Sequence, residues 1–294
     1  MIILDKYVLA LLKCKGIGNA KTLNYIMKYD KNIELIKKHL DELIDEEELQ
    51  KFDIYLKQSE EEIFENQKNQ IEIISVLNEN YPTKLLAIKD PILYLYYKGN
   101  INLIYNTSIA VIGSREINLH EELITKEISE KISNKGITIV SGLANGTDTQ
   151  AHLASFKQKG KTIAVLASGL NIITPSNNRQ LAKNILISGG LLVSEYSHNK
   201  IATKYSFVKR DRIQAALSDA VIVIKANLNS GTMHTVKAAQ SADKYVTQYK
   251  TNENNQIYNV FENSENDISI IIKEAKNKKY NIKVSKKYEQ TSLF

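Results

Sequence analysis

Arginine is the side chain in this sequence best suited to bind phosphate, and it is rare. The planar guanidinium binds phosphate through two parallel hydrogen bonds and stacks on flat rings, whereas a lysine ammonium acts as a point charge. Of 39 basic residues only four are arginines, all in the middle of the chain: Arg115, Arg179, Arg210 and Arg212. Their positions in loops or at helix starts favour binding of a phosphate-rich ligand, and chance within a lysine-rich composition is the alternative.

Short turns rich in glycine and hydroxyl groups form a second candidate set. The stretch ITIVSGLANGTDTQAH, residues 137–152, predicts a strand, a tight turn and a helix with Asp148 as its N-cap. Glycines let backbone amides approach an anion, and the helix dipole adds attraction. The residues that we expect to line such a site from these turns are Gly113, Ser114, Ser141, Gly142, Asn145, Gly146, Ser230, Gly231 and Thr232.

The sequence motifs of several enzyme classes are missing. There is no GxGxxG after the first strand of the repeating pattern, no GxxxxGK[ST] and no GxSxG, which argues against dinucleotide oxidoreductases, P-loop ATPases and serine hydrolases. The five histidines show no metal-ligand spacing with cysteine or acids, and His152, one turn after Asp148, predicts a structural hydrogen bond rather than a catalytic dyad. We therefore expect a binding protein without catalytic residues, metal or cofactor.

Charge and cysteine content indicate the compartment and the partner. Residues 1–80 hold 11 Lys against 16 Asp and Glu, a net charge of −5. Because the whole chain has a net charge of +6, residues 81–294 carry a net charge of +11. A basic larger part favours a polyanionic partner. The single cysteine, Cys14, predicts a buried thiol in a reducing compartment, and the chain shows no membrane-spanning apolar run and no signal peptide. These features together predict a cytoplasmic protein.

The elements that must position these groups follow a repeating pattern. Apolar strands at 108–113, 137–142, 161–169, 190–196, 219–226 and 244–249 alternate with helices, the last strand closing the sheet. Almost wholly apolar strands separated by helices predict a parallel sheet covered on both faces, with ligands outside the strands' carboxyl ends. The fold class is therefore α/β, an extended, Rossmann-like, doubly wound and mostly parallel sheet.

Three domains are expected. Residues 1–66 read as a small helical domain, whose Gly16-Ile17-Gly18 is similar to a helix–hairpin–helix turn but is more simply a turn in so acidic a region. Residues 67–250 are expected to form the extended Rossmann-like domain that holds the candidate site. Residues 251–294 are a polar, lysine-rich segment in which ISIIIKEA is a helix or a strand, and no winged helix is expected.

Seven segments between residues 71 and 246 resemble, in collinear order, the DNA-processing protein A (DprA, also called Smf) family. They are YPTKLLAIKDPILYLYYKGN, AVIGSRE, SGLANGTDTQAH, KTIAVLASGLNIITPSNNRQL, LLVSEY, FVKRDRIQAALSDAVIVIKA and NSGTMHTVKAAQSADKYV. The chain departs from the family pattern at Asn145, normally basic, at Thr147, normally Ile, at Val208, normally Pro, and at Asp211, normally Asn.

The resemblance implies a single-stranded DNA-binding protein, without known catalysis, that forms homodimers and helps to load the RecA recombinase during natural transformation. It implies that Arg115, Lys209, Arg210 and Arg212 contact the DNA backbone and that Arg179 lines the same pocket. Phe207 is then either a base-stacking residue or a core aromatic at a helix start.

Two other functions remain open. Related Rossmann-like nucleotide phosphoribohydrolases also carry a GSR turn, but their PGGxGTxxE motif is replaced here by NSGTMHT at residues 229–235, without the Glu that would serve as acid or base. A sensor of small nucleotides would use the same pocket for one phosphate-bearing ligand.

Overall fold

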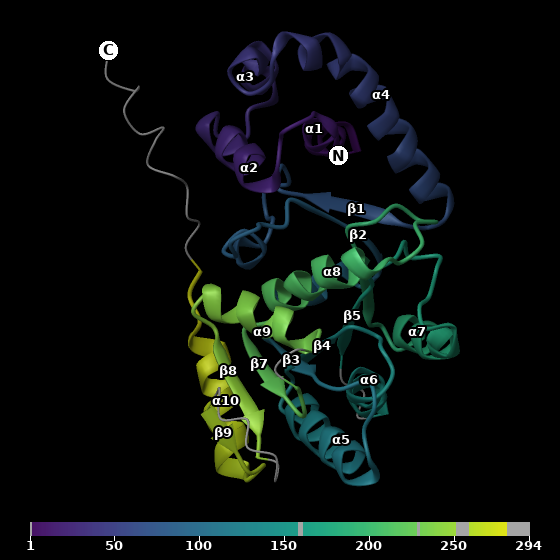
Figure 1. Ribbon diagram of the computed structural model, residues 1–294, viewed down its shortest axis with the longest axis vertical. Helices are drawn as coiled ribbons and strands as arrows, with labels where there is room; N and C mark the ends of the chain where they lie inside the picture. The colour runs from purple at the N-terminus through teal and green to yellow at the C-terminus, as the bar shows by residue number, and fades with distance from the viewer. Residues whose placement is uncertain (1, 158–160, 228–229, 251–258, 281–294) are drawn as a thin grey trace. The chain divides into compact units, whose positions relative to one another are not determined.

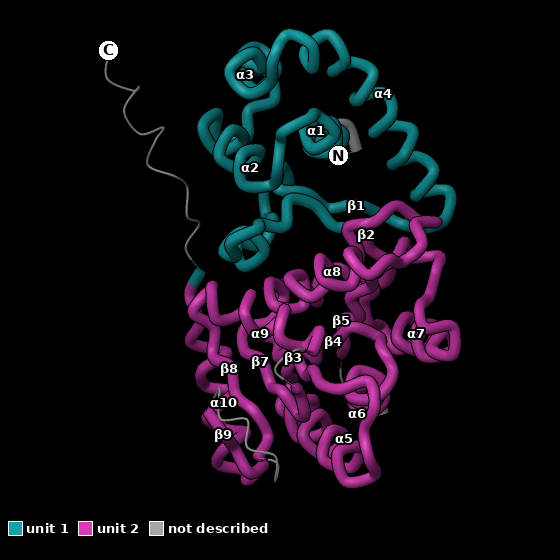
Figure 2. Tube along the Cα trace, viewed as in Figure 1, with its two compact units in different colours: residues 1–95, 280–294 teal, residues 96–279 magenta. Residues whose placement is uncertain are grey.

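The structure, a computed structural model, describes residues 2–157, 161–227, 230–250 and 259–280, apart from the side chains of residues 2, 3 and 157. Two compact units divide the chain: Met1–Leu95 together with Tyr280–Phe294, and Tyr96–Lys279 (Figure 2). The expected domains, 1–66, 67–250 and 251–294, divide it differently, and the last of them lies partly outside the described residues.

The first unit is mainly helical. It contains α1 (Ile2–Lys13), α2 (Asn19–Lys28), α3 (Ile33–Lys38), α4 (Glu46–Lys68) and the short strand β1 (Glu72–Ser75). The side chains of Asn32 and Asp45 cap α3 and α4 by accepting hydrogen bonds from backbone amides in the first turns. Gly16 adopts a positive φ of 75° in the turn between α1 and α2. Cys14 is buried, as expected, and its thiol donates to the carbonyl oxygen of Ala10.

The second unit is built on a twisted sheet of eight strands in the order β2-β6-β5-β4-β3-β7-β8-β9 (Figure 1). Only β2 runs antiparallel to its neighbour, and the other pairs are parallel. Strands β3 to β7 are buried along their whole length, as continuous apolar runs predict. The strands are β2 (Tyr94–Gly99), β3 (Ser108–Ile112), β4 (Thr138–Ser141), β5 (Thr162–Val165), β6 (Leu191–Ser194), β7 (Ala220–Val223), β8 (Tyr245–Tyr249) and β9 (Asn259–Phe261).

Helices cover both faces of this sheet. One face carries α5, α6, α7 and α10, and the other carries α8 and α9 (Figure 1). Capping boxes fix the starts of α5, through Asn118 and Glu121, and of α8, through Thr203 and Ser206. The helices are α5 (Leu119–Asn134), α6 (Thr147–Lys157), α7 (Arg179–Ile187), α8 (Lys204–Leu217), α9 (Thr232–Ser241) and α10 (Glu265–Asn277). The expected doubly wound, mostly parallel Rossmann-like fold with a helical N-terminal region is confirmed.

The expectation that residues 244–249 close the sheet is wrong. Strand β9 pairs with β8 in parallel, and ISIIIKEA belongs to helix α10 rather than to a strand. Phe261, Ile268 and Ile271 are buried in the same apolar core as Ile109 of β3. The burial of these apolar side chains stabilises β9 and α10 against the rest of the second unit.

No helix among the described residues combines the length and the apolar character needed to span a membrane.

Candidate functional site

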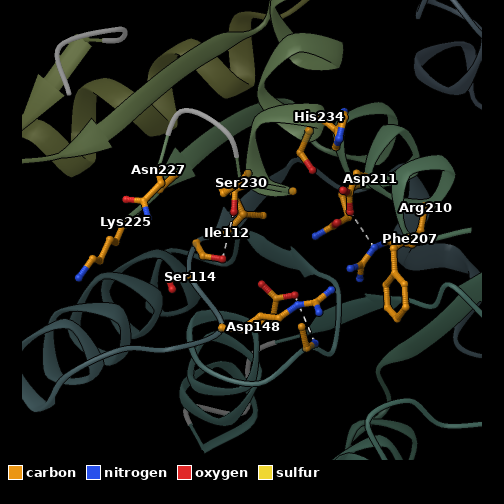
Figure 3. A pocket seen from close by; sticks show the side chains of 18 of the residues that line it. Ile112, Ser114, Asp148, Phe207, Arg210, Asp211, Lys225, Asn227, Ser230 and His234 are labelled. Carbon is orange, nitrogen blue, oxygen red and sulfur yellow. Dashed lines mark hydrogen bonds and ion pairs between the residues drawn. The ribbon is translucent and has the colours of Figure 1, made fainter. Parts of the chain in front are cut away.

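A pocket of about 470 Å³ opens at the carboxyl ends of β3 and β7. These strands are neighbours in the sheet, but the chain leaves β3 toward β4 on its other side, so the pocket lies where the order of strands reverses. Open α/β sheets bind ligands at such points because the two loops that leave the strands separate there. The pocket is of a size typical for small-ligand sites. Figure 3 shows its lining side chains, which come from the turn after β3, from α6, from α8, and from β7 to α9.

Arg115 lies at the rim of this pocket on the turn that follows β3. Its side chain is exposed, and its guanidinium carbon lies 5.1 Å from the centroid of the Phe207 ring. No carboxylate forms an ion pair with Arg115 among the residues that the structure describes. Phe207, in the first turns of α8, is only partly buried. A cation supported by an aromatic face therefore stands at the pocket entrance.

The start of α9 forms a second wall. Gly231 occupies the N-cap position without a side-chain cap, and the helix begins at Thr232, whose hydroxyl donates to the carbonyl oxygen of Gly113 at 3.1 Å. The hydroxyl of Ser230 is buried and has no partner among the described residues. An uncapped helix N-terminus attracts anions through its dipole and its amides.

Arg210 is buried in the pocket wall, with only 5% of its surface exposed. Its Nη1 donates to the carbonyl oxygens of Gly142 and Val165, and its Nε donates to a carboxylate oxygen of Asp211 at 3.0 Å. A Cβ atom at Gly142 would lie 1.7 Å from Nη1 of Arg210. Glycine is therefore favoured at residue 142, because the guanidinium occupies the space that a side chain would take.

The loop between β4 and α6 differs from its expected role. Asp148 is not the N-cap of α6: it lies inside the first turn, and its carboxylate accepts from the amides of Gly142 and Ala144 at 3.1 and 3.3 Å. The Ser141 hydroxyl is buried and donates to the carbonyl oxygen of Val111. Burial raises the pKa of Asp148, and the neighbouring Arg210 opposes that shift. The Gly142 amide and the Ser141 hydroxyl, which we expected to bind an anion, already form hydrogen bonds within the protein.

Gly146 serves the same loop through its conformation. It has a φ of +74°, and a Cβ there would lie 2.5 Å from the carbonyl oxygen of Ser114. Two turns at the ends of β3 and β4 thus pack backbone against backbone, and only glycine permits this approach.

Seven of the expected site residues do not line this pocket. Arg212 forms an ion pair with Glu195 through two contacts of 2.8 and 2.6 Å, and both side chains are about nine-tenths buried. Arg179 is exposed at the start of α7, and the Asn145 side chain accepts from Asn177. The seven are Ser141, Gly142, Asn145, Gly146, Arg179, Lys209 and Arg212. Those that do line it are Gly113, Ser114, Arg115, Phe207, Arg210, Ser230, Gly231 and Thr232.

Several polar side chains that the sequence did not single out as site residues also line the pocket, among them Asp211, Lys225 and His234. Lys225 follows β7 directly and pairs with Glu121 at 2.9 Å. Its position after an apolar strand was a usable signal, since carboxyl ends of parallel strands carry ligand groups. Burial raises the pKa of Asp211 to about 6, although Arg210 lowers it.

His152 takes a structural role, as expected from its place on α6. It is fully buried, and its Nδ1 lies 2.7 Å from the hydroxyl of Thr162. Burial lowers its pKa to about 3, so the ring is neutral near pH 7. The described residues contain no group of three or more His, Cys, Asp or Glu side chains placed to hold a metal ion.

Comparison with known proteins gives a consistent picture. The family model described as DNA recombination-mediator protein A matches residues 72–277. Protein Smf of Escherichia coli is 38% identical over 167 residues, which cover 57% of this chain and 45% of that protein. DNA processing protein DprA of Streptococcus pneumoniae is 36% identical over 172 residues, 58% of this chain and 60% of that one. The matched region thus spans about half the length of these curated relatives.

Two solved structures are similar over most of the chain. DNA processing protein A from Streptococcus pneumoniae superposes with a TM-score of 0.70 at 27% identity, covering 87% of this chain and 94% of that one. The structure from Helicobacter pylori, described for its single-stranded DNA binding mode, gives a TM-score of 0.63 at 29% identity, with 72% and 98% covered.

Proposed function

The chain belongs to the DNA recombination-mediator protein A family, and on that premise we propose that it binds single-stranded DNA in the pocket between β3 and β7. One observation carries the proposal. The exposed Arg115 guanidinium lies over the Phe207 ring at the pocket rim and has no carboxylate partner among the described residues. A cation next to an aromatic ring offers contacts to both parts of an unpaired nucleotide, its phosphate and its base.

The phosphate would bind between the turn after β3 and the start of α9. Arg115 supplies the charge, and the uncapped N-terminus of α9 with the Ser230 hydroxyl supplies hydrogen-bond donors. Helix N-termini favour anions most strongly within their first turn. The Thr232–Gly113 hydrogen bond supports this geometry by tying the two walls together.

Single strands are favoured over duplexes because a pocket of about 470 Å³ has the size of a site for one small ligand. A nucleotide enters such a recess only when its base is not paired and stacked inside a double helix. Stacking of a base on an aromatic ring such as Phe207 contributes on the order of 1–3 kcal/mol and tolerates any sequence.

The strand would continue along the exposed basic side chains outside the pocket. Lys204, at the start of α8, and Arg179, at the start of α7, are exposed, and Lys209 is partly exposed with its ammonium near Tyr205. We assign Arg210 and Arg212 to shaping the site rather than to direct contact, because both are bonded internally.

We extend the proposal to the wider role of the family. The protein would act in the cytoplasm as a homodimer that brings single-stranded DNA to a RecA-type recombinase during recombination and natural transformation. Family membership supports this extension, as does the recombination-mediator description of the matching model.

The test is a binding series. Fluorescence anisotropy with labelled single strands of increasing length, and with matched duplexes, is measured at two salt concentrations. The proposal predicts tighter binding to single strands, with affinity that falls as salt rises because released counterions drive binding. Equal affinity for duplex and single strand, or no binding to either, would contradict it.

A small-nucleotide sensor is the second candidate, and the size of the pocket favours it, since the recess suits a ligand of one nucleotide. Competition separates the two functions. A sensor would release bound oligonucleotide at mononucleotide concentrations far below those that a DNA-binding protein would need.

A further inference from the structure

Asp211 places a carboxylate in the wall of the pocket with one oxygen atom unused. The residue is 7% exposed and lines the pocket. Its Oδ1 accepts from Nε of Arg210 at 3.0 Å, whereas no described residue donates to Oδ2, and this oxygen is not fully enclosed by the protein. Figure 3 shows Asp211 and His234 on one side of the pocket and Lys225 and Asn227 on the other.

A carboxylate of a largely buried residue with one oxygen open to the pocket is a strong acceptor, and a ligand that supplies a hydrogen-bond donor can pair with it. A phosphate cannot do so, because its oxygens are acceptors at neutral pH and carry like charge. The carboxylate of Asp148 lines the same pocket and strengthens this repulsion. The Asp211 side of the pocket therefore suits a neutral group that carries N–H donors.

The opposite requirement holds at the turn after β3. Ser114 and the exposed Arg115 line the pocket there. The turn after β3 thus favours an anion, whereas Asp211, whose Oδ2 lies near Gly231 at the start of α9, favours a hydrogen-bond donor. A nucleotide carries both kinds of group, an anionic phosphate and a base edge with hydrogen-bond donors.

We propose that Asp211 recognises the base of the nucleotide bound in this pocket by accepting a hydrogen bond from its exocyclic amino group. The inference rests on the proposed binding of single-stranded DNA. Cytosine and adenine carry such an amino group, whereas uracil and thymine place a carbonyl oxygen at the equivalent position and would be repelled by the carboxylate. The chain therefore prefers strands with amino-bearing bases over strands of uracil or thymine.

The test compares strands that differ at this group. Labelled homopolymers of deoxycytidine and of deoxyuridine, equal in length, are titrated by anisotropy at about pH 8, where Asp211, with its pKa of about 6, is ionised. We expect the deoxycytidine strand to bind roughly five- to tenfold more tightly, the lower end of the discrimination from one base contact. Asp211→Asn should abolish or reverse the difference, because the amide oxygen would stay toward Nε of Arg210 and the NH₂ group would face the base.

Glu116→Gln is the matched control. Glu116 also lines the pocket but is exposed, so its neutralisation removes the same charge without touching the buried acceptor. This variant should bind both strands more tightly and keep the preference for deoxycytidine. Binding of both strands with equal affinity by the unmodified protein, or a preference that survives Asp211→Asn, would overturn base recognition and leave the proposed function standing. Failure to bind either strand would overturn the proposed function and the inference with it.

Discussion

The guanidinium of Arg115 lies 5.1 Å from the centre of the Phe207 ring, and this contact joins the turn after β3 to the first turns of α8. Both residues line the pocket. The aromatic face orients the arginine without neutralising it, as a carboxylate partner would. The charge thus stays available to a ligand, and the position of each side chain depends on the other.

Replacing Phe207 with Leu should weaken binding of single strands about 5- to 100-fold, because a base loses its stacking surface and Arg115 loses its support. Leucine keeps apolar volume at the start of α8, so the fold should persist. Anisotropy gives the affinity, and thermal unfolding checks the fold. A variant that unfolds normally and binds like the unmodified protein would assign Phe207 to packing alone.

Gly142→Ala should lower the free energy of unfolding by roughly 1–3 kcal/mol, since the new methyl group would overlap the guanidinium of Arg210. Gly231→Ala is the control in the same unit, because the atom nearest to its added Cβ is 4.0 Å away. The control should change stability by less than about 0.5 kcal/mol. Denaturant unfolding of both variants measures the difference, and similar values would show that Arg210 is free to move aside.

Lys244 is buried, and its ammonium donates to the carbonyl oxygens of Ala215, Ala216 and Ser218 at the end of α8. These carbonyls lie in the last turn or beyond it, where helices leave acceptors unsatisfied. Lys244→Met keeps the stem but removes the donor, and should destabilise the protein by about 1.5–3 kcal/mol in urea unfolding. Lys237→Met, on an exposed face of α9, should leave stability nearly unchanged.

Stability should also depend on pH through Asp211. Burial raises its pKa to about 6 in the folded protein, from 3.8 as the ordinary value, so the folded state holds the proton more tightly than the unfolded state. Stability attributable to this group is then full below pH 3.8 and falls as pH rises toward 6. Asp211→Asn should therefore be more stable than the unmodified protein near pH 8, by on the order of 1–3 kcal/mol, with the difference shrinking toward pH 4. A stability difference that does not change with pH would show that titration of the Asp211 carboxyl group is not its cause.

Much of the second unit follows from the sequence because its signals are local. Uninterrupted apolar strands with intervening helices predict a parallel sheet, and the residues after β3 and before α9 follow from the rule that ligands bind at carboxyl ends. Strand β9 and α10 escaped prediction in part because three strand residues carry little pattern of their own. Their order comes from apolar side chains, such as Phe261, that reach a core built by distant residues.

The orientation of the basic residues on α8 could not be taken from their closeness in sequence. Successive residues of a helix point about 100° apart, so Arg210 points well away from both Lys209 and Arg212. The structure turns Arg210 inward and Arg212 toward Glu195. The use of the amides at Gly142 and Ala144 by Asp148 was equally hidden, because a carboxylate within the first turn looks the same in sequence as a cap.

The most direct test of the account is the affinity of Arg115→Ala for single-stranded DNA across a range of salt concentrations. Lys135→Ala is the control, since it removes an equal charge from an exposed position at the end of α5. The account predicts that Arg115→Ala weakens binding about tenfold or more and lowers the slope of log affinity against log salt by about one, whereas Lys135→Ala changes neither appreciably. Unchanged affinity and slope in Arg115→Ala, with the fold intact, would contradict the assignment of this pocket to DNA.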